Sequence, residues 1–482
     1  LGDVYKRQAD RVEISNANIE AAGNLMGGKV RIGGDYLGGQ DLTIMDNKNV
    51  YGFVSRFGDQ PSIQNSKQTI VKADTNIDVS SKKGQGGTAV VWSDQMTDFE
   101  GKINARGAEI VALTTITNET KSTYKSSKDP PILTIKTKLE PIESTVDPPP
   151  KHVIKLSRNQ VKSQVDPPPP KIFDKGGGFV EISSKNYLKR ANIAGVSLNG
   201  GTLLLDPRDI YVRDSSKSGY TLTSNLSDVD SFNDGTNALY QVNSSTIETA
   251  LTAGTNVILQ ARQDIFVQSD IIATGSSGGD LTLNAGVDIE ISADITTANG
   301  DLNLIANNAS VTSRGTNHSD IDVTSTLNLG SGDLNITLGN VSSGDSNNVH
   351  LGLATINANN ITLTDSGTGS NTSRVSVLGD LNASSAINVT STNKRVNVDN
   401  ASLTANGTGT AVDITSKYLS GNGGSVSTPN GIWRATNTDT SSNGARFGGF
   451  TGNFIQYGYS SGDAIQGTGS GLLSGYDPGN LT

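Results

Sequence analysis

The sequence contains no cysteine among its 482 residues. Disulfide bonds, thiol nucleophiles and cysteine-ligated metal sites are therefore all excluded. A chain without cysteine is also suited to crossing an oxidising periplasm in an unfolded state, because no premature disulfide can form there. Aromatic residues supply only 5% of the chain and apolar residues 34%, which is too little for large globular cores of packed helices and sheets.

Other functional signals are scarce as well. No apolar run approaches the roughly 18 residues that a membrane-spanning helix requires, so we expect no membrane span. The formal net charge of −9 leaves no chain-wide basic surface to attract nucleic acid. The three histidines, His152, His318 and His350, are scattered along the chain. We therefore predict no catalytic residue, no metal site and no cofactor.

The first eight residues, Leu1 to Gln8, lack the pattern of the chain that follows, and no signal peptide is present. We interpret residues 1–8 as a non-native leader and the sequence as an internal fragment of a longer protein. The missing export signals therefore carry no information about the location of the mature protein.

A short repeat dominates the middle of the chain. Three segments alternate apolar side chains with Thr, Asn, Gln or Ser, which is the pattern of a strand with one buried face. These segments are residues 256–265, 280–289 and 301–306. Leu302 follows Leu281 by 21 positions, and Val257 precedes Leu281 by 24. Strands at this period, without a helical stripe, predict an all-β solenoid. After about Ala306 the repeat is less regular, and the sequence does not fix the register.

Glycine, with 55 residues, supplies the tight corners that each coil of strands requires. Paired glycines at positions 27–28, 33–34, 38–39 and 86–87 lie between apolar segments, where corners are expected. The pattern predicts a first β-helical part over residues 9–106 and a second part over residues 176–430. Residues 431–482, rich in glycine and aromatic side chains, are interpreted as a transition to a missing C-terminal region.

Residues 107–175 have a different composition. They hold ten of the 14 prolines, nine of them in blocks after Asp129, Asp147 and Asp166 that are 18 and 19 residues apart. From Lys121 to Lys175, eleven Lys and Arg residues face six Asp and Glu residues, a local charge of +5. This composition predicts a long, flexible Pro- and Lys-rich insertion. A basic arm that binds an acidic surface, such as lipopolysaccharide or peptidoglycan, is the alternative.

Five segments occur in an order that resembles the filamentous haemagglutinin family of large bacterial exoproteins. The segments are Gly27–Gly39, Gly86–Asp94, Phe99–Gly107, Gly177–Lys185 and Gly201–Pro207. The resemblance implies a right-handed parallel β-helix, export by two-partner secretion through an outer-membrane transporter, and in many members adhesion. In this sequence about 70 residues separate the third segment from the fourth, which usually follow almost directly. The N-terminal secretion domain is not visible, so the transporter would be contacted through a region outside this fragment.

Carboxylates are the one feature that favours catalysis. Asp264 and Asp288 are expected to stack one coil apart, as are Asp280 and Asp301, and paired carboxylates on a parallel β-helix are used by polysaccharide-cleaving enzymes. These residues lie beside strand starts, where Asp hydrogen-bonds its own turn, so we favour a structural role. Incidental Ca²⁺ binding has no support from a nonapeptide array.

Three further features of the sequence are of kinds that binding sites use. Trp92 follows two valines in a strand, which favours packing over ligand stacking. The glycines 467, 469 and 471 lack the flanking strand, helix and lysine of a phosphate loop and indicate a turn. Thr221-Leu-Thr223 and Thr362-Leu-Thr364 would suit an ice-binding Thr surface, but such rows do not recur at constant register in the sequence.

Together these features predict a monomeric fragment of a secreted or surface-displayed adhesin from a Gram-negative bacterium. It would be extracellular or on the outer cell surface and act as an elongated scaffold. Its expected partners are the two-partner secretion transporter and host or microbial surface glycans or receptors, with no nucleic acid and no membrane span. The alternative is a polysaccharide-cleaving parallel β-helix enzyme.

Overall fold

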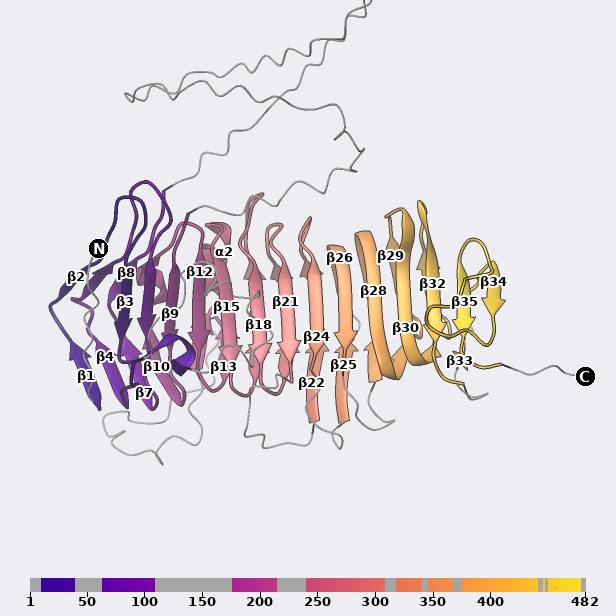
Figure 1. Ribbon diagram of the computed structural model, residues 1–482, viewed down its shortest axis with the longest axis horizontal. Helices are drawn as coiled ribbons and strands as arrows, with labels where there is room; N and C mark the ends of the chain where they lie inside the picture. Colours follow the sequence, from indigo (N-terminus) through magenta and orange to yellow (C-terminus); the bar gives the residue numbers. More distant parts are fainter. Residues whose placement is uncertain are drawn as a thin grey trace, which may run out of the picture. The chain divides into compact units, whose positions relative to one another are not determined.

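The computed structural model describes ten stretches of the chain. These are residues 10–39, 63–108, 176–214, 240–307, 318–339, 346–352, 354–366, 374–440, 445–446 and 450–477. Short strands dominate them, and the paired strands among them run parallel. Each strand pairs with strands of the neighbouring coils, so that the coils follow one another in sequence order (Figure 1). The structure confirms the predicted all-β parallel β-helix.

Two of the sequence assignments fall on residues outside the described stretches. They are the leader, residues 1–8, and residues 109–175 of the Pro-rich insertion. Both assignments stay predictions. Among the described residues, no helix has the length and hydrophobicity needed to cross a membrane.

Each coil contributes strands to as many as three faces, and the first face is the longest. Its strands are β3 (Lys29–Ile32), β6 (Thr88–Val91), β9 (Phe179–Ser183), β12 (Thr202–Asp206), β15 (Asn256–Ala261), β18 (Leu281–Ala285), β21 (Leu302–Ala306), β24 (Leu334–Leu338), parts of β26 (Thr355–Asp365), β28 (Asp380–Asn397) and β30 (Gly409–Ser420), then β32 (Gly431–Asn437) and β35 (Gly471–Ser474). The parallel pairing continues through β32 and β35, beyond the boundary that the sequence placed at residue 430.

The second face consists of two groups of strands that belong to different sheets. Its strands are β1 (Arg11–Ile14), β4 (Gln68–Val71), β7 (Met96–Phe99) and β10 (Tyr187–Ala191), followed by β14 (Tyr240–Asn243), β13 (Ile210–Arg213), β16 (Ile265–Val267), β19 (Ile289–Ile291), β22 (His318–Val323), β25 (Ser346–Leu351), β27 (Arg374–Val377) and β33 (Ala445–Arg446), with the ends of β28 and β30 between the last two. The first four form a sheet of their own.

The third face has the shortest strands. They are β2 (Asn18–Glu20), β5 (Asn76–Asp78), β8 (Lys102–Asn104) and β11 (Val196–Ser197), then β17 (Ile271–Ile272), β20 (Ile295–Thr296), β23 (Leu327–Asn328), the starts of β26 and β28, β29 (Ser402–Ala405) and β31 (Ser425–Ser427). Near the end of the described chain, β34 (Phe454–Gln456) pairs with β35.

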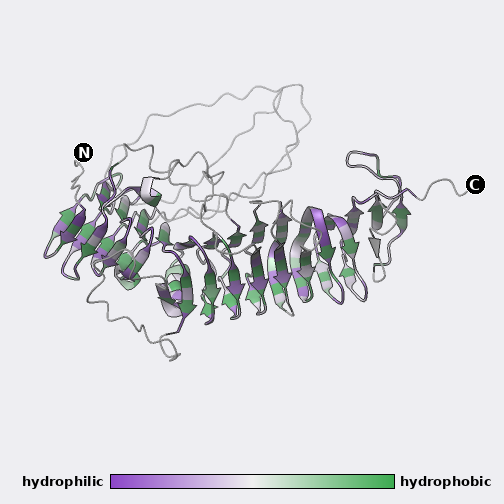
Figure 2. Ribbon diagram, turned by 90° about the horizontal axis from the view of Figure 1, so that it is seen from below, coloured by the Kyte–Doolittle hydropathy of each residue, from purple (hydrophilic) through white to green (hydrophobic). Residues whose placement is uncertain are grey.

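The core is a set of columns that run from coil to coil. Leu302 pairs with Leu281, and Leu281 pairs with Val257, as the repeat spacings predicted. Leu334 continues the column, 32 positions after Leu302. All four side chains are almost completely buried, and burying each contributes about 1.5–3 kcal/mol relative to exposure. Figure 2 shows the resulting alternation of hydrophobic and hydrophilic residues along the strands.

Among the described residues, one α-helix interrupts the strand pattern. Helix α2 (Ser244–Thr252) connects the second face to the first, where other coils carry a third-face strand. Asn243 caps it by accepting from the Ser245 N–H at 3.1 Å. Ile247 and Leu251, one turn apart, are buried in the common core. The other helical elements in the part of the chain that the structure describes are single turns, η1 (Tyr36–Gly39) and η2 (Ile193–Gly195).

Paired glycines form the corner before the first face, as predicted for positions 27–28 and 86–87. A Cβ atom on Gly87 would lie 1.9 Å from the carbonyl oxygen of Gly28, and one on Gly178 would lie 2.1 Å from that of Gly87. Backbones of successive coils therefore meet here at a distance that no side chain allows. The stack continues to Gly201, which has φ +91°.

Candidate functional site

Aspartates line the corner where the chain enters the second face. The Asp288 N–H donates to Oδ1 of Asp264 at 3.1 Å, and the Asp320 N–H donates to Oδ1 of Asp288 at 2.7 Å. The ladder begins at Asp209 and ends at Asn348. The predicted stacking of Asp264 and Asp288 is confirmed. These carboxylates also bind the backbone of the next coil, a contact that the sequence analysis did not predict.

A second ladder precedes the first face. The Asp301 N–H donates to Asp280 Oδ1 at 2.8 Å, and the Asp333 N–H donates to Asp301 Oδ1 at 2.8 Å. At its start Asn256 Oδ1 accepts from the Asp280 N–H, and at its end the Asn360 N–H donates to Asp333 Oδ1. A shorter ladder of Asp270, Asp294 and Thr326 precedes the third face. Either Asp or Asn can accept the hydrogen bond from the next coil, because acceptance needs only a side-chain oxygen.

The ladder explains why the pKa of one of these groups is displaced. Burial, reinforced by the neighbouring charge of Asp288, raises the pKa of Asp264 to about 6. A carboxyl group with such a pKa is suited to general-acid chemistry near neutral pH. The Asp264 carboxylate, however, is engaged by the Asp288 N–H. We therefore interpret its raised pKa as a result of stacking carboxylates between coils.

The histidines are not brought together. Nδ1 of His350 lies 3.0 Å from Oδ1 of Asp322 on the outer side of the second face, and both side chains are 42% exposed. His318 belongs to β22, and His152 lies outside the described residues. In the stretches that the structure describes, no group of three or more His, Asp or Glu side chains is arranged to hold a metal ion.

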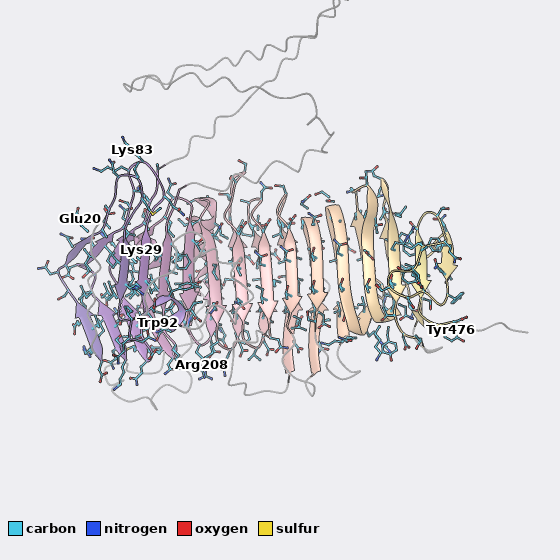
Figure 3. All side chains as sticks on the ribbon, in the orientation of Figure 1. Glu20, Lys29, Lys83, Trp92, Arg208 and Tyr476 are labelled. Atoms are coloured by element: carbon cyan, nitrogen blue, oxygen red, sulfur yellow. The ribbon has the colours of Figure 1, made fainter. Side chains whose placement is uncertain are left out.

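A short segment covers the outer side of the first face near the N-terminal end. This segment, residues 33–39, is called the strap. It carries Tyr36 and Leu37 onto Val90, Trp92 and other outward side chains of the sheet, and all of them are buried. The remaining members of this outer apolar cluster are Phe179, Leu204 and Ile258. The tryptophan, labelled in Figure 3, thus packs as predicted, but on the outside of the coil.

Trp92 contacts the strap along most of its indole ring. A Cβ atom on Gly34 would lie 2.4 Å from Cδ1 of the indole, and one on Gly38 would lie 2.5 Å from Cζ2. The Trp92 Nε1–H donates to Asp94 Oδ1 at 3.3 Å. Asn65 holds the strap from the other side, because its Nδ2 donates both to Asp94 Oδ1 and to the carbonyl oxygen of Gly38.

A buried carboxyl group fixes the strap to the sheet. The N–H of Leu37 donates to both carboxyl oxygens of Glu181, at 3.1 and 3.2 Å, and Glu181 is fully buried. Arg31 Nη1 also binds Asp35 of the strap at 2.8 Å. Burial, with a further contribution from the charge of Asp206, raises the pKa of Glu181 well above its ordinary value.

Asp206 is a second buried acid on the outer side of the first face, at the end of β12. Burial raises its pKa to about 8, although the Gln260 side chain and the charge of Arg262 act in the opposite direction. Gln260 Nε2 donates to Asp206 Oδ2 at 3.2 Å. Neither Glu181 nor Asp206 is accessible to a polysaccharide, because both are buried.

The Thr-x-Thr pair of residues 362–364 does not recur in the neighbouring coils, as the sequence analysis expected, but a single row of threonines does. Five outward positions of the first face, in successive coils, form one row. They are Thr337, Thr364, Thr390, Thr415 and Thr436. The parallel row two residues earlier is mixed, with Asn335, Thr362, Asn388, Asp413 and Arg434. Thr221 and Thr223 lie outside the described residues. The surface therefore carries one Thr row beside a mixed one.

The glycines at 467, 469 and 471 have a packing role. Cβ atoms on Gly467 and Gly471 would lie 2.1 and 2.3 Å from ring atoms of Phe454, and Gly469 has φ +77°. The turn is glycine-rich because the ring of Phe454 packs against its backbone and one residue is left-handed.

The sequence analysis missed Glu181. The alternating pattern places it on the outer side of β9, where a solvated side chain is expected. A signal was nevertheless present, because Val90, Leu204 and Ile258 make their strands apolar on both sides. Strands that are apolar on both sides indicate a covered outer face.

Neither the models of known protein families nor the curated proteins give a match to this chain.

Proposed function

We propose that this chain is part of the elongated shaft of a secreted or surface-displayed bacterial adhesin, exported by two-partner secretion. The observation that carries the proposal is the unbroken parallel pairing of the first face from β3 to β35. A stack of coils extends as residues are added, whereas a globular domain grows in all directions. Such a body is suited to holding a binding surface away from a cell.

The use of the polar groups supports binding rather than catalysis. The corner aspartates are hydrogen-bonded to the backbone of the next coil. The outward rows of the later coils present Thr and Asn, side chains that both donate and accept hydrogen bonds. Affinity for a surface glycan or receptor would then arise from many weak contacts along the coils.

The export route rests on the resemblance of five segments to the filamentous haemagglutinin family. A cysteine-free stack suits that route, because each emerging coil can pair with the coil before it. A gene for an outer-membrane transporter beside the gene for this protein would support the proposal. A neighbouring cluster of polysaccharide-degradation genes would contradict it.

Binding is best tested with the chain displayed at high and low density on beads, against arrays of glycans and whole cells. We expect weak binding at low density and a steep gain at high density, because multivalent contacts raise avidity by orders of magnitude. Equal binding at both densities would indicate a single strong site instead. No binding at either density would leave a spacer role only.

A second candidate function, cleavage of an acidic polysaccharide, is favoured by the raised pKa of Asp264 beside Asp288. Incubation with polygalacturonate and similar polymers tests it. We expect no release of reducing or unsaturated ends. Turnover that is lost in Asp264→Asn would establish the enzyme, since the Asn side chain preserves the ladder bond.

A further inference from the structure

The carboxyl group of Glu181 lies between the sheet and the strap, shielded from water. Its polar contacts include the N–H of Leu37, at 3.1 and 3.2 Å from the two carboxyl oxygens. Two more carboxyl groups act on it, Asp206 on β12 and Asp35 in the strap. Asp35 is itself paired with Arg31. An ionised Glu181 would therefore sit in a low dielectric close to like charges.

The strap is the element that can give this carboxyl group access to water. It covers the outer side of the first face through Tyr36 and Leu37, whereas the inner side of the sheet is the continuous core. Its own conformation is poorly favoured, because Leu37 has φ 47° and Gly38 has φ 68°. L-residues rarely adopt that region without support from their surroundings. The contact with Glu181 supplies part of that support.

We propose that the strap is a proton-operated latch, which lies on the first face while Glu181 carries a proton and lifts when Glu181 ionises. Opening exposes the outer apolar cluster, with Trp92 and Phe179 at its centre. This proposal does not depend on the adhesive function.

The direction of the pH dependence follows from the surroundings of Glu181. Burial and the charge of Asp206 raise its pKa, while the hydrogen bonds from the Leu37 N–H lower it only in part. In the open state the carboxyl group is hydrated and its pKa returns to the ordinary value. The contribution of Glu181 to closure is therefore complete below its ordinary pKa, the value in the open state. It is lost as the pH rises through its raised pKa, the value in the closed state. Asp206, with a pKa of about 8, acts in the same direction, although Arg262 opposes it.

Fluorescence of Trp92 in the full chain tests the latch. The chain has two tryptophans, so Trp433→Phe leaves Trp92 as the single reporter. Between pH 5 and pH 9 we expect its emission to shift to longer wavelength and its quenching by acrylamide to rise severalfold. In Glu181→Gln, which keeps an acceptor oxygen for Leu37 but cannot ionise, both signals should stay at their low-pH values. Asp206→Asn should move the transition to lower pH.

Two controls distinguish opening of the strap from other effects of pH on the chain. Glu20, exposed on β2 and labelled in Figure 3, gives the matched variant Glu20→Gln, which should titrate like the parent. Hydrogen exchange of residues 33–39 in the unmodified chain should accelerate with pH beyond the intrinsic rate, while far-ultraviolet circular dichroism stays constant. Quenching and corrected exchange that do not change with pH, or a Glu181→Gln variant that titrates like the parent, would overturn the proposal.

Discussion

Lys394 Nζ lies 3.0 Å from Asp365 Oδ1, and both side chains are completely shielded from solvent. Ser391 Oγ donates to the second carboxyl oxygen of Asp365 at 2.9 Å. Asp365 stands in a column that holds Ala306 and Leu338 in the two preceding coils. An ion pair therefore replaces an aliphatic side chain at this point of the stack.

This pair leads to a test by single and double replacement. Lys394→Met would leave a buried carboxylate without its cation, and we expect a loss of about 3–5 kcal/mol in unfolding free energy. The double variant Lys394→Met with Asp365→Leu continues the aliphatic column and should recover most of that loss. Urea denaturation followed by circular dichroism measures both. Lys67→Met, which breaks an exposed pair with Asp10, serves as the control and should change stability by less than about 1 kcal/mol. A double variant as unstable as the single one would contradict the argument.

The aspartate ladders give a second prediction. Oδ1 of Asp288 accepts from the Asp320 N–H at 2.7 Å. Asp288→Ala leaves that partly buried N–H without its acceptor, and we expect a loss of about 1–3 kcal/mol. Asp288→Asn keeps the oxygen and should be nearly neutral, as the natural Asn256 of the parallel ladder indicates, since its Oδ1 accepts from the Asp280 N–H. Thermal unfolding of the three chains distinguishes them. Equal loss in both variants would mean that the negative charge is needed.

Much of the fold could be predicted because the core repeats. The spacing between Leu281 and Leu302 equals the number of residues in one coil, since a parallel β-helix places equivalent residues in adjacent strands. Between Leu302 and Leu334 the spacing grows to 32. The additional residues lie between β21 and β22 in the sequence, and the column keeps its register from β21 to β24. A period measured along the sequence cannot separate corner residues from strand residues, and register was lost there.

The outer surface was harder to predict, because contacts across it join distant residues. Leu37 and Glu181 are 144 positions apart, and no local pattern relates them. Helix α2 was missed for a different reason. Its nine residues carry only two buried aliphatic side chains, Ile247 and Leu251, among Ser and Thr, and so short a stripe does not stand out.

The buried acids predict how global stability depends on pH. The pKa of Asp206 is raised to about 8 in the folded chain, and the unfolded value is the ordinary one. The folded state therefore holds a proton that the unfolded state releases, and this contribution to stability decreases as the pH rises from about 4 to about 8. Asp264, with a pKa of about 6, also contributes stability that decreases as the pH rises, but over a lower pH range.

We expect the urea midpoint to be higher at pH 5 than at pH 8. Asp206→Asn should reduce that difference, since its side chain does not titrate and its amide oxygen can still accept from Gln260. The matched control is Asp74→Asn, at an exposed turn position, which should leave the difference unchanged. A midpoint that rises between pH 5 and pH 8 in the parent chain would show that Asp206 is ionised in the folded state.

The last prediction concerns the fit of the strap on Trp92. Gly38 has φ +68°, and a Cβ atom there would lie 2.5 Å from Cζ2 of the indole. Gly409 also has a positive φ, +72°, but nothing lies within 4 Å of its Cβ position. Both Gly→Ala variants carry the penalty of a left-handed L-residue, about 1–2 kcal/mol, and only Gly38→Ala adds a clash with a rigid ring. We expect Gly38→Ala to displace the strap, so that acrylamide quenches Trp92 several times more strongly, while circular dichroism keeps the β-helix spectrum. Gly409→Ala should leave Trp92 as shielded as in the parent chain. Equal shielding of Trp92 in both variants would mean that the indole moves aside without cost, and that the polar contacts of the strap with Glu181, Arg31 and Asn65 hold it in place.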